Sequence, residues 1–475
     1  MRIPFVGPAY QSRSLNADCQ RAVNCFLEFD NASPRAPIAL YGTPGTVLEF
    51  TLGATPVRGS ITQGQFSFFV AGNRVYKVDT SYAATLLGTI GTSTGPVGLA
   101  SNGAEVLVVD GTGGWLATTG ALTQITDVDF PNGVRSCCFI GGFFVVTGDG
   151  SGQFYWNETP NQGTEWNGLD FASAEGSPDA TVGCVASHLE LILFGNSSSE
   201  IWVLTGAADL PFIRSGNTFI EVGAAAYTSI NTLDNTVFWL GQDTEGAGIV
   251  YRLNGYTPVR ISTHAIEKEI QSYATITDAI GFTYQQEGHS FYVLTFPTAS
   301  RTWVFDVATS QWHERAWMNQ STGELYRWRA NCHIYFNNKN LVGDFENGKV
   351  YSLDLDTYTD DGEEIKFLRT TQCLDSPEGQ RNFYDFLTVD METGVGLATG
   401  LGSSPLLMLE WSNDGGHTWC TNPQYLSIGA VGEYGARARA TRLGQGRNRV
   451  WRISITDPVK RAVLGAYTRF RVGAS

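Results

Sequence analysis

The segment GTSTG (Gly91 to Gly95) places a serine between glycines with the spacing of a nucleophile elbow. Such an elbow presents the serine hydroxyl for acyl transfer only where a strand precedes the turn and a helix follows it. Here Pro96 and the strand-like sequence VGLA follow the motif instead. We therefore expect Ser93 to be an ordinary residue of a glycine-rich turn and predict no catalytic residue in this segment.

Residues that could bind a metal are scattered along the chain. The six histidines include no H-E-x-x-H motif and no close pair, so the sequence predicts no hydrolytic zinc site. The acidic run from Asp354 to Glu364 lacks the ordered ligand positions of an EF-hand, and we expect a solvated turn around Asp361 and Gly362. The eight cysteines contain no C-x-x-C pair and are predicted to be reduced, structural thiols. We predict no metal site and no cofactor.

The sequence WSNDGGHTW contains the pattern S-x-D-x-G-x-T-W. This pattern resembles the Asp-box hairpin of sialidases and other propellers, in which short polar side chains bond to turn backbone while the tryptophan packs beneath. We expect a structural turn, carried by Ser412, Asp414, Gly416 and Trp419. Only one copy occurs, whereas sialidases have several copies, an arginine triad and a tyrosine nucleophile that we do not find here.

Charge is distributed unevenly along the chain. With 31 Lys and Arg against 46 Asp and Glu, the net charge is −15, so a basic footprint over the whole surface is absent. From Val431 to the C-terminus, however, ten basic and two acidic residues give +8. Arginine forks suit phosphate and carboxylate groups alike, which leaves solvated surface, subunit or partner contact and DNA contact open. The candidate contact residues are Arg437, Arg439, Arg442, Arg447, Arg449 and Arg452.

Composition and a repeat predict the architecture. The chain has 475 residues, is 42% hydrophobic and 12% aromatic, and contains 54 glycines, which favours many short strands joined by turns. Short alternating segments each place one aromatic residue mid-strand, at intervals of roughly 40 to 50 residues, which is the period of a β-propeller. The markers are Tyr76, Trp115, Tyr155, Trp202, Tyr251, Trp303 and Tyr351. Without Trp115 the number of units falls from seven to six, and unrelated hairpins in β-sandwiches are the alternative.

The period ends after Asp354, where an acidic, turn-rich stretch begins. We predict an all-β protein with an N-terminal arm (1–40), a β-propeller of six or seven blades (41–356) and an additional C-terminal β-rich domain (357–475). The clearest helix is expected at 262–274, between two blades. No apolar run is long enough for a membrane span or a secretory signal, so we expect no membrane insertion and a protein made in the cytoplasm.

Longer segments carry a family resemblance across nearly the whole chain. They include RAVNCFLEF (Arg21 to Phe29), ALYGTPGTVLEF (Ala39 to Phe50), DNTVFWLGQD (Asp234 to Asp243), YQQEGHSFYVLTFP (Tyr284 to Pro297), VGDFENGKVY (Val342 to Tyr351) and ITDPVKR (Ile455 to Arg461). The chain resembles the tail hub, or packaged-DNA stabilisation, proteins of short-tailed bacteriophages.

The resemblance implies a structural subunit of the virion tail that catalyses no reaction and is assembled in the cytoplasm of the host bacterium. It implies a ring of self-associated copies, sixfold, that forms the nozzle below the portal and adaptor, closes the head, retains packaged DNA and forms part of the ejection channel. Implied partners are the head-to-tail adaptor protein, tail needle and tail spike or fibre proteins, with DNA passing through without sequence-specific binding. The alternative interpretation is a sialidase-like or glycan-binding β-propeller.

Overall fold

The computed structural model describes residues 1–30, 37–174, 176, 179–207, 210–374 and 379–473. Two compact units are present, and each combines segments that are distant in the sequence. One unit, here the propeller unit, contains residues 48–300 and 329–353. The other, here the sandwich unit, contains residues 1–47, 301–328 and 354–475. The predicted boundaries at 40 and 356 stay a prediction.

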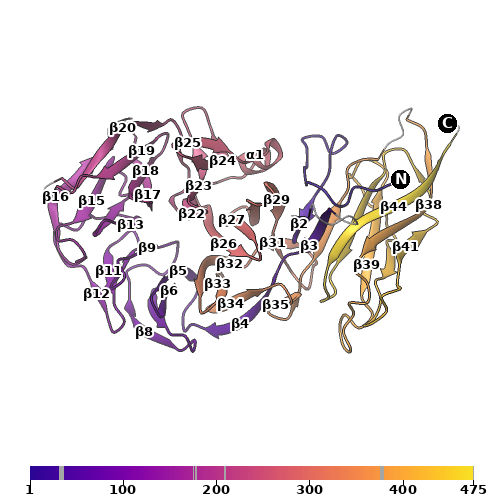
Figure 1. The fold of residues 1–475 in the computed structure, drawn as a ribbon, viewed down its shortest axis with the longest axis horizontal. Coiled ribbons are helices and arrows are strands. Elements are labelled where there is room, and N and C mark those ends of the chain that lie inside the picture. The colour runs from indigo at the N-terminus through magenta and orange to yellow at the C-terminus, as the bar shows by residue number, and fades with distance from the viewer. Residues whose placement is uncertain (31–36, 175, 177–178, 208–209, 375–378, 474–475) are drawn as a thin grey trace. The chain divides into compact units, whose positions relative to one another are not determined.

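The propeller unit is built from consecutive antiparallel sheets, seen as successive colours from purple to orange in Figure 1. In the first four, spatial order equals chain order. These strands are β5 (Val57–Gln63), β6 (Phe66–Ala71), β7 (Arg74–Val78) and β8 (Ala84–Thr89); β9 (Gly98–Ser101), β10 (Val106–Val109), β11 (Gly114–Ala117) and β12 (Leu122–Gln124); β13 (Ser136–Ile140), β14 (Phe143–Thr147), β15 (Gln153–Asn157) and β16 (Trp166–Ser173); and β17 (Thr181–Ser187), β18 (Glu190–Gly195), β19 (Ser199–Leu204) and β20 (Phe212–Ile220).

The remaining elements of the unit are one further sheet, a helix, a strand pair and a group of three strands. The fifth sheet holds β21 (Gly223–Ala224), β22 (Asn231–Leu233), β23 (Thr236–Gln242), β24 (Ala247–Asn254) and β25 (Thr257–Arg260). After it come the helix α1 (His264–Gln271), the pair β26 (Ile280–Gln286) and β27 (His289–Phe296), and the three strands β32 (Ala330–Phe336), β33 (Lys339–Asp344) and β34 (Lys349–Asp354). The strand β4 (Gly45–Thr51) spans the boundary between the units.

One strand from each blade, here called its first strand, contacts the first strand of the next blade, so that these strands form a ring. β5 contacts β9, β9 contacts β13 and β13 contacts β17, which contacts the 3-10 helix η1 (Tyr227–Ser229) that leads into β22. β22 then contacts β26, β26 contacts β32, and β32 returns to β5. The ring confirms the β-propeller, and its seven first strands in the described part of the chain correspond to seven blades.

Six of the seven aromatic markers lie in strands of the propeller unit. Tyr76, Trp115, Tyr155 and Trp202 occupy β7, β11, β15 and β19, each the third strand of its sheet in chain order. Tyr351 occupies β34, which lies between β33 and β4 in its sheet. Tyr251 lies in β24, which pairs between β23 and β25, and Trp303 lies in the sandwich unit. Trp115 therefore marks a blade of its own.

Apolar packing between neighbouring blades holds the propeller together. Phe68, Val70 and Val75 of the first blade form one buried cluster with Val108 and Trp115 of the second. A single blade would leave these faces exposed to water, so each blade depends on its neighbours for burial. The predicted helix is confirmed over His264–Gln271.

A second repeat, which the aromatic pattern did not reveal, occurs at the turn before the third long strand. Asp110, Asp149, Asp243 and Asp344 each accept a hydrogen bond at Oδ1 from the backbone N–H two residues on, at 2.7 to 2.9 Å. An aspartate at this turn position accepts hydrogen bonds from nearby backbone N–H groups and so stabilises the turn of the hairpin. The signal is visible as a recurring Asp followed by Gly within four residues.

In the described residues, the sandwich unit contains two large sheets besides the short pairs β30-β31 and β35-β36. One has the order β2-β3-β44-β38-β41 with β42 beside β38, and the other includes the run β28-β29-β1-β37-β43-β39-β40. Its strands are β1 (Ala22–Val23), β2 (Cys25–Phe29), β3 (Ile38–Gly42), β28 (Arg301–Asp306), β29 (Gln311–Glu314), β30 (Ala316–Met318), β31 (Leu325–Arg327), β35 (Thr359–Asp360), β36 (Glu363–Glu364), β37 (Phe367–Thr370), β38 (Asn382–Met391), β39 (Leu406–Ser412), β40 (Gln424–Ser427), β41 (Ala438–Thr441), β42 (Gln445–Gly446), β43 (Val450–Ile455) and β44 (Ala462–Val472).

Both sheets contribute to one buried core, which confirms an additional β domain. Leu387 and Val463 come from the first sheet, and Leu409, Trp451 and Ile453 come from the second. Alternating burial along β38 and β41 is the pattern of strands with one face in a core and one in water.

Candidate interaction surfaces

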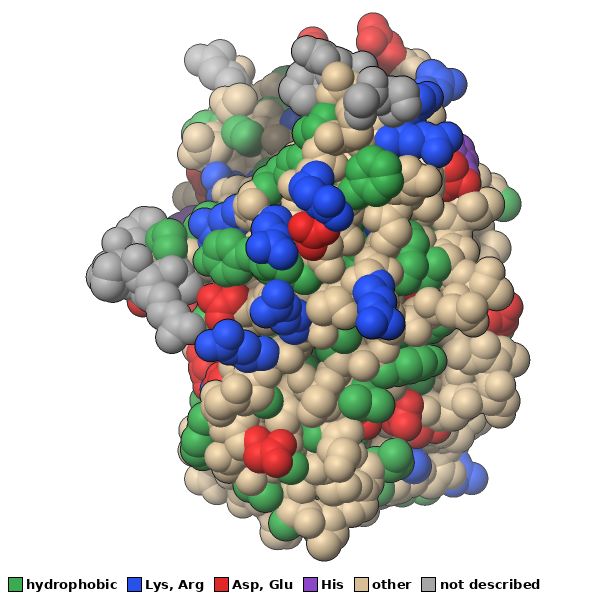
Figure 2. Space-filling view, turned by 90° about the vertical axis from the view of Figure 1, so that its right-hand side faces the viewer, with side chains coloured by type: hydrophobic (Ala, Val, Ile, Leu, Met, Phe, Trp, Pro, Cys, Tyr) green, Lys and Arg blue, Asp and Glu red, His purple; other side chains and the backbone are tan. Residues whose placement is uncertain are grey.

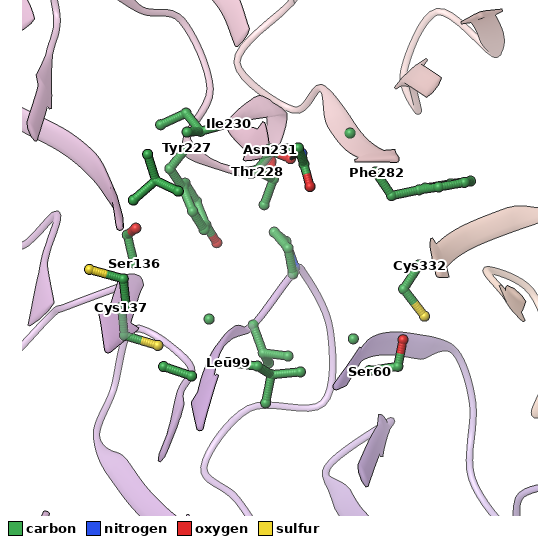
Figure 3. A pocket seen from close by; sticks show the side chains of 18 of the residues that line it. Ser60, Leu99, Ser136, Cys137, Tyr227, Thr228, Ile230, Asn231, Phe282 and Cys332 are labelled. Atoms are coloured by element: carbon green, nitrogen blue, oxygen red, sulfur yellow. Dashed lines mark hydrogen bonds between the residues drawn. The ribbon is translucent and has the colours of Figure 1, made fainter. Parts of the chain in front are cut away.

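First strands of the propeller line an open axial cavity of about 430 Å³ (Figure 3). Its lining mixes hydroxyl, amide, thiol and apolar side chains, among them Ser60, Ser136, Tyr227, Asn231 and Cys332. Burial raises the pKa of Cys332 to about 11 and that of Tyr227 to about 12, so both groups stay protonated at neutral pH. A protonated thiol is a poor nucleophile, and the cavity offers packing and hydrogen bonding rather than thiol chemistry.

Arg58 and His333 are the basic side chains at this cavity. The Arg58 guanidinium donates to the carbonyl oxygens of Gly72 (2.8 Å) and Thr94 (2.8 Å). Its hydrogen-bonding capacity is thus directed at backbone within the propeller. Desolvation lowers the pKa of His333 to about 4, so its ring is neutral at physiological pH.

The acidic run is only partly the solvated turn that we predicted. Asp361 and Gly362 both have positive φ angles, as a tight turn between β35 and β36 requires. Asp360, in contrast, is 8% exposed and its Oδ1 accepts from the Thr46 hydroxyl at 3.2 Å. Burial raises the pKa of Asp360 to about 6, with Arg315 and Arg461 opposing the shift. The prediction of a solvated segment is therefore wrong for Asp360, because β35 pairs alongside Thr46 of β4.

The Asp-box residues form a hydrogen-bonded turn between β39 and β40. The Ser412 hydroxyl donates to Asp414 Oδ1 at 2.5 Å and accepts from the Gly416 N–H at 2.9 Å. Asp414 also accepts from the Thr418 N–H and hydroxyl, at 2.9 and 2.6 Å. These bonds hold the pKa of Asp414 well below its usual range. Trp419 lies under the Arg452 guanidinium, 3.8 Å from the ring centroid. The turn belongs to the sandwich unit and not to a propeller blade.

The structure separates the six candidate arginines into different environments. Arg437, Arg439, Arg442 and Arg447 are exposed. Arg452 pairs with Glu410 through two bonds of 2.7 Å. Arg449 is 0% exposed and donates to Asn413 Oδ1 (2.8 Å) and to the Leu443 carbonyl (2.9 Å). Its side chain packs among the rings of Tyr384, Trp411 and Trp451. Arg449 therefore has no exposed surface that a partner could contact.

Sequence reasoning did not identify the aromatic side chains that lie among the exposed arginines. The outward surface of β38, β41 and β44 carries what we call the basic face: Arg439, Arg469, Arg471, Phe383, Phe386 and Tyr467. Figure 2 views the side on which these strands lie in Figure 1 and shows Lys and Arg side chains gathered among hydrophobic ones. Alternating exposure along the three strands was the available signal, but a bulge between Tyr384 and Phe386 interrupts it.

Contacts on the basic face order its side chains. Arg439 lies 4.1 Å and Arg469 lies 5.3 Å from the centroid of the Phe386 ring. Asp385 accepts from both Arg469 and Arg471, each at 3.1 Å. The two arginine side chains nevertheless remain 69% and 76% exposed. Arginine and aromatic residues together are typical of protein–protein contact regions.

No cluster of three or more His, Cys, Asp or Glu with metal-binding geometry occurs among the residues that the structure describes. In the same described ranges, no helix has the length and apolar character to cross a membrane.

Comparisons with known proteins identify the family to which the chain belongs. The family described as "Bacteriophage P22 Gp10, beta-propeller" matches residues 12–358, and that described as "Bacteriophage P22 Gp10, beta-sandwich" matches residues 366–471. A curated relative, the "Tail hub protein gp10" of Salmonella phage P22, is 23% identical over 269 residues. The match spans 55% of this chain and 56% of that protein, so the chain covers little more than half the length of this relative.

The solved structures that match part of this chain include a computationally designed protein, Ika8, and the Pan2 WD40 domain of Neurospora crassa. Ika8 has a TM-score of 0.39 at 15% identity and is covered to 98%, with 72% of this chain aligned. The Pan2 domain has a TM-score of 0.43 at 10% identity and is covered to 96%, with 68% of this chain aligned.

Proposed function

Since the chain belongs to the Bacteriophage P22 Gp10 family, we propose that it is a tail hub subunit, a structural component of a phage virion tail. The observation that carries the proposal is the family match over both units, from residue 12 to 358 and from 366 to 471. In this role the protein catalyses no reaction. It is assembled in the host cytoplasm and remains in the tail.

We further propose a ring of copies, sixfold, that forms the nozzle below portal and adaptor. The ring would close the head, retain packaged DNA and carry needle and spike or fibre proteins. The exposed arginines Arg437, Arg442 and Arg447 are proposed as contacts to the adaptor, since guanidinium groups on a solvent-facing surface can bind carboxylates of a partner. Arg449 is left out of this set because its side chain is buried.

The charge of the propeller unit supports passage of DNA along a channel without tight binding to the channel wall. The propeller unit contains 11 Lys and Arg and 25 Asp and Glu, a net charge of −14. Acidic walls repel phosphate at short range, while screening limits the repulsion beyond about 8–10 Å at physiological salt. A channel bordered by such a unit would guide a duplex without binding its sequence.

The test is the copy number of this chain in purified, DNA-filled particles, measured by quantitative mass spectrometry against the portal subunit. A fixed ratio near half the portal count is the expected result for a sixfold nozzle. Absence of the chain from particles would overturn the proposal and favour the glycan-processing or glycan-binding propeller.

A further inference from the structure

We propose that the basic face of one copy binds an acidic edge on the propeller unit of the next copy, so that identical chains join head to tail. This inference rests on the proposed function, because it assigns the contact by which copies form a ring. The two surfaces differ from each other and lie on different units. The contact is therefore heterologous, which generates either a closed ring or a filament.

The acidic edge consists of Asp127, Val128, Asp129, Glu165 and Leu169, at the outer strand of the third blade and the loop after the second. Val128 is 93% exposed and Leu169 is 82% exposed. Two close approaches place the loop beside β16: Asp127 Oδ2 accepts from the Trp166 N–H at 3.1 Å, and Asp129 lies against Gly168. The acidic edge thus combines two exposed apolar side chains with three carboxylates.

Buried aromatic packing fixes the loop of the acidic edge against β16. The buried Phe130 packs edge-on against Trp166, with ring centroids 4.9 Å apart. The Trp166 indole N–H donates to the Gly163 carbonyl at 2.9 Å. The exposed residues therefore project from a fixed backbone, which reduces the entropy lost when a partner binds.

The basic face has the complementary chemistry. Its guanidinium groups, on Arg439, Arg469 and Arg471, match the carboxylates of the acidic edge, and its exposed Phe383 and Tyr467 match the apolar side chains. The side chains of the face are also ordered. Asp385 accepts hydrogen bonds from Arg469 and Arg471, and the Phe386 ring contacts Arg439 and Arg469. The net charge of −14 on the propeller unit also favours approach of a basic surface over a second acidic one.

Charge reversal tests the pairing in the full chain. Arg469→Glu with Arg471→Glu makes both surfaces acidic, and Asp129→Arg with Glu165→Arg makes both basic. Each double variant alone should self-associate about 100-fold more weakly than the wild type, since like charges then meet. Mixed in equal amounts, the two variants should associate again, because alternating copies restore opposite charges at every contact. Sedimentation velocity at low and moderate salt measures each case.

A matched control reverses two exposed basic residues outside both surfaces, Arg13→Glu with Lys268→Glu. This variant should associate like the wild type, and circular dichroism should show that all variants are folded. The pairing is overturned if the mixture fails to associate while the wild type does, if the control is weakened equally, or if the wild type stays monomeric at every concentration. None of these results changes the copy number in particles, so failure of the pairing is distinguishable from failure of the proposed function.

Discussion

Among the residues that the structure describes, the two units differ in their buried arginines. The propeller unit has one, Arg58, whereas the sandwich unit has five: Arg315, Arg327, Arg369, Arg449 and Arg461. The propeller repeats one hairpin pattern and closes its ring through apolar contacts between its last and first blades. The sandwich is assembled from segments at both ends of the chain and one in the middle. Its buried guanidiniums bond to backbone carbonyls of several of these segments, as Arg369 does to Phe5 and Pro8.

The difference shows two ways of specifying a β fold. Repetition lets each blade present the same apolar edge to the next, so the architecture follows from period alone. A sheet without repeats needs contacts that distinguish the correct neighbouring strand from others. A buried guanidinium provides such a contact, because it is stable only where backbone carbonyls accept its hydrogen bonds. We therefore expect single changes to be more destructive in the sandwich unit than in the propeller unit.

The largest effect is expected for Arg449→Ala. The substitution empties a site between three aromatic rings and leaves the Leu443 carbonyl and Asn413 without their donor. We expect a loss of about 3–5 kcal/mol in the free energy of unfolding. Hydrogen–deuterium exchange, resolved by peptide, should show faster exchange in the sandwich unit and unchanged protection in the propeller. The exposed neighbour Arg447→Ala is the control, and an equal loss there would contradict the prediction.

Opposite pH dependence of the two units is the next effect. The folded-state pKa of Asp360 is raised to about 6, so folded protein holds a proton that the unfolded chain releases, and the sandwich unit loses stability as pH rises from about 4 to 6. The slope is at most about 1 kcal/mol per pH unit. His333 has its pKa lowered to about 4, so the propeller loses stability as pH falls from about 6.5 toward 4.

Urea unfolding between pH 4 and 7, followed by exchange in each unit, measures both slopes. Asp360→Asn should flatten the slope of the sandwich unit alone, and His333→Gln should flatten that of the propeller alone. A single slope shared by both units in either variant would show that they unfold as one body and would break the comparison.

A smaller effect is expected inside the propeller ring from Gly98→Ala in β9. A Cβ atom there would lie 2.7 Å from the Arg135 carbonyl oxygen and 2.7 Å from Val109 Cγ2, so neighbouring first strands must separate. We expect a loss of about 1–3 kcal/mol in the free energy of unfolding, seen as a lower midpoint in urea. Gly120→Ala, which meets nothing within 4 Å, is the matched control and should leave the midpoint unchanged.

The smallest effect is expected for Asp414→Ala at the turn between β39 and β40. The variant loses the bonds to Thr418 and Ser412 at a partly exposed site. We expect a loss of about 1 kcal/mol in the free energy of unfolding, comparable with removal of a helix cap. Thermal unfolding measures it, and faster exchange confined to the turn would sharpen the comparison. A fall as large as that of Arg449→Ala would contradict a purely local role.

Sequence by itself determined the parts of this protein that repeat or act locally. The spacing of Tyr76, Trp115 and Tyr155 predicted the propeller because each blade presents the same strand pattern. The Asp-box pattern predicted its turn because Ser412 and Asp414 bond within six residues of themselves. Tertiary structure alone decided which arginines are interior, since burial of Arg449 depends on the rings of Tyr384 in β38 and Trp411 in β39, which lie far from it in the sequence. It also decided that Asp360 is buried and that arginines from β41 and β44 share one face, because strand pairing over long distances sets both.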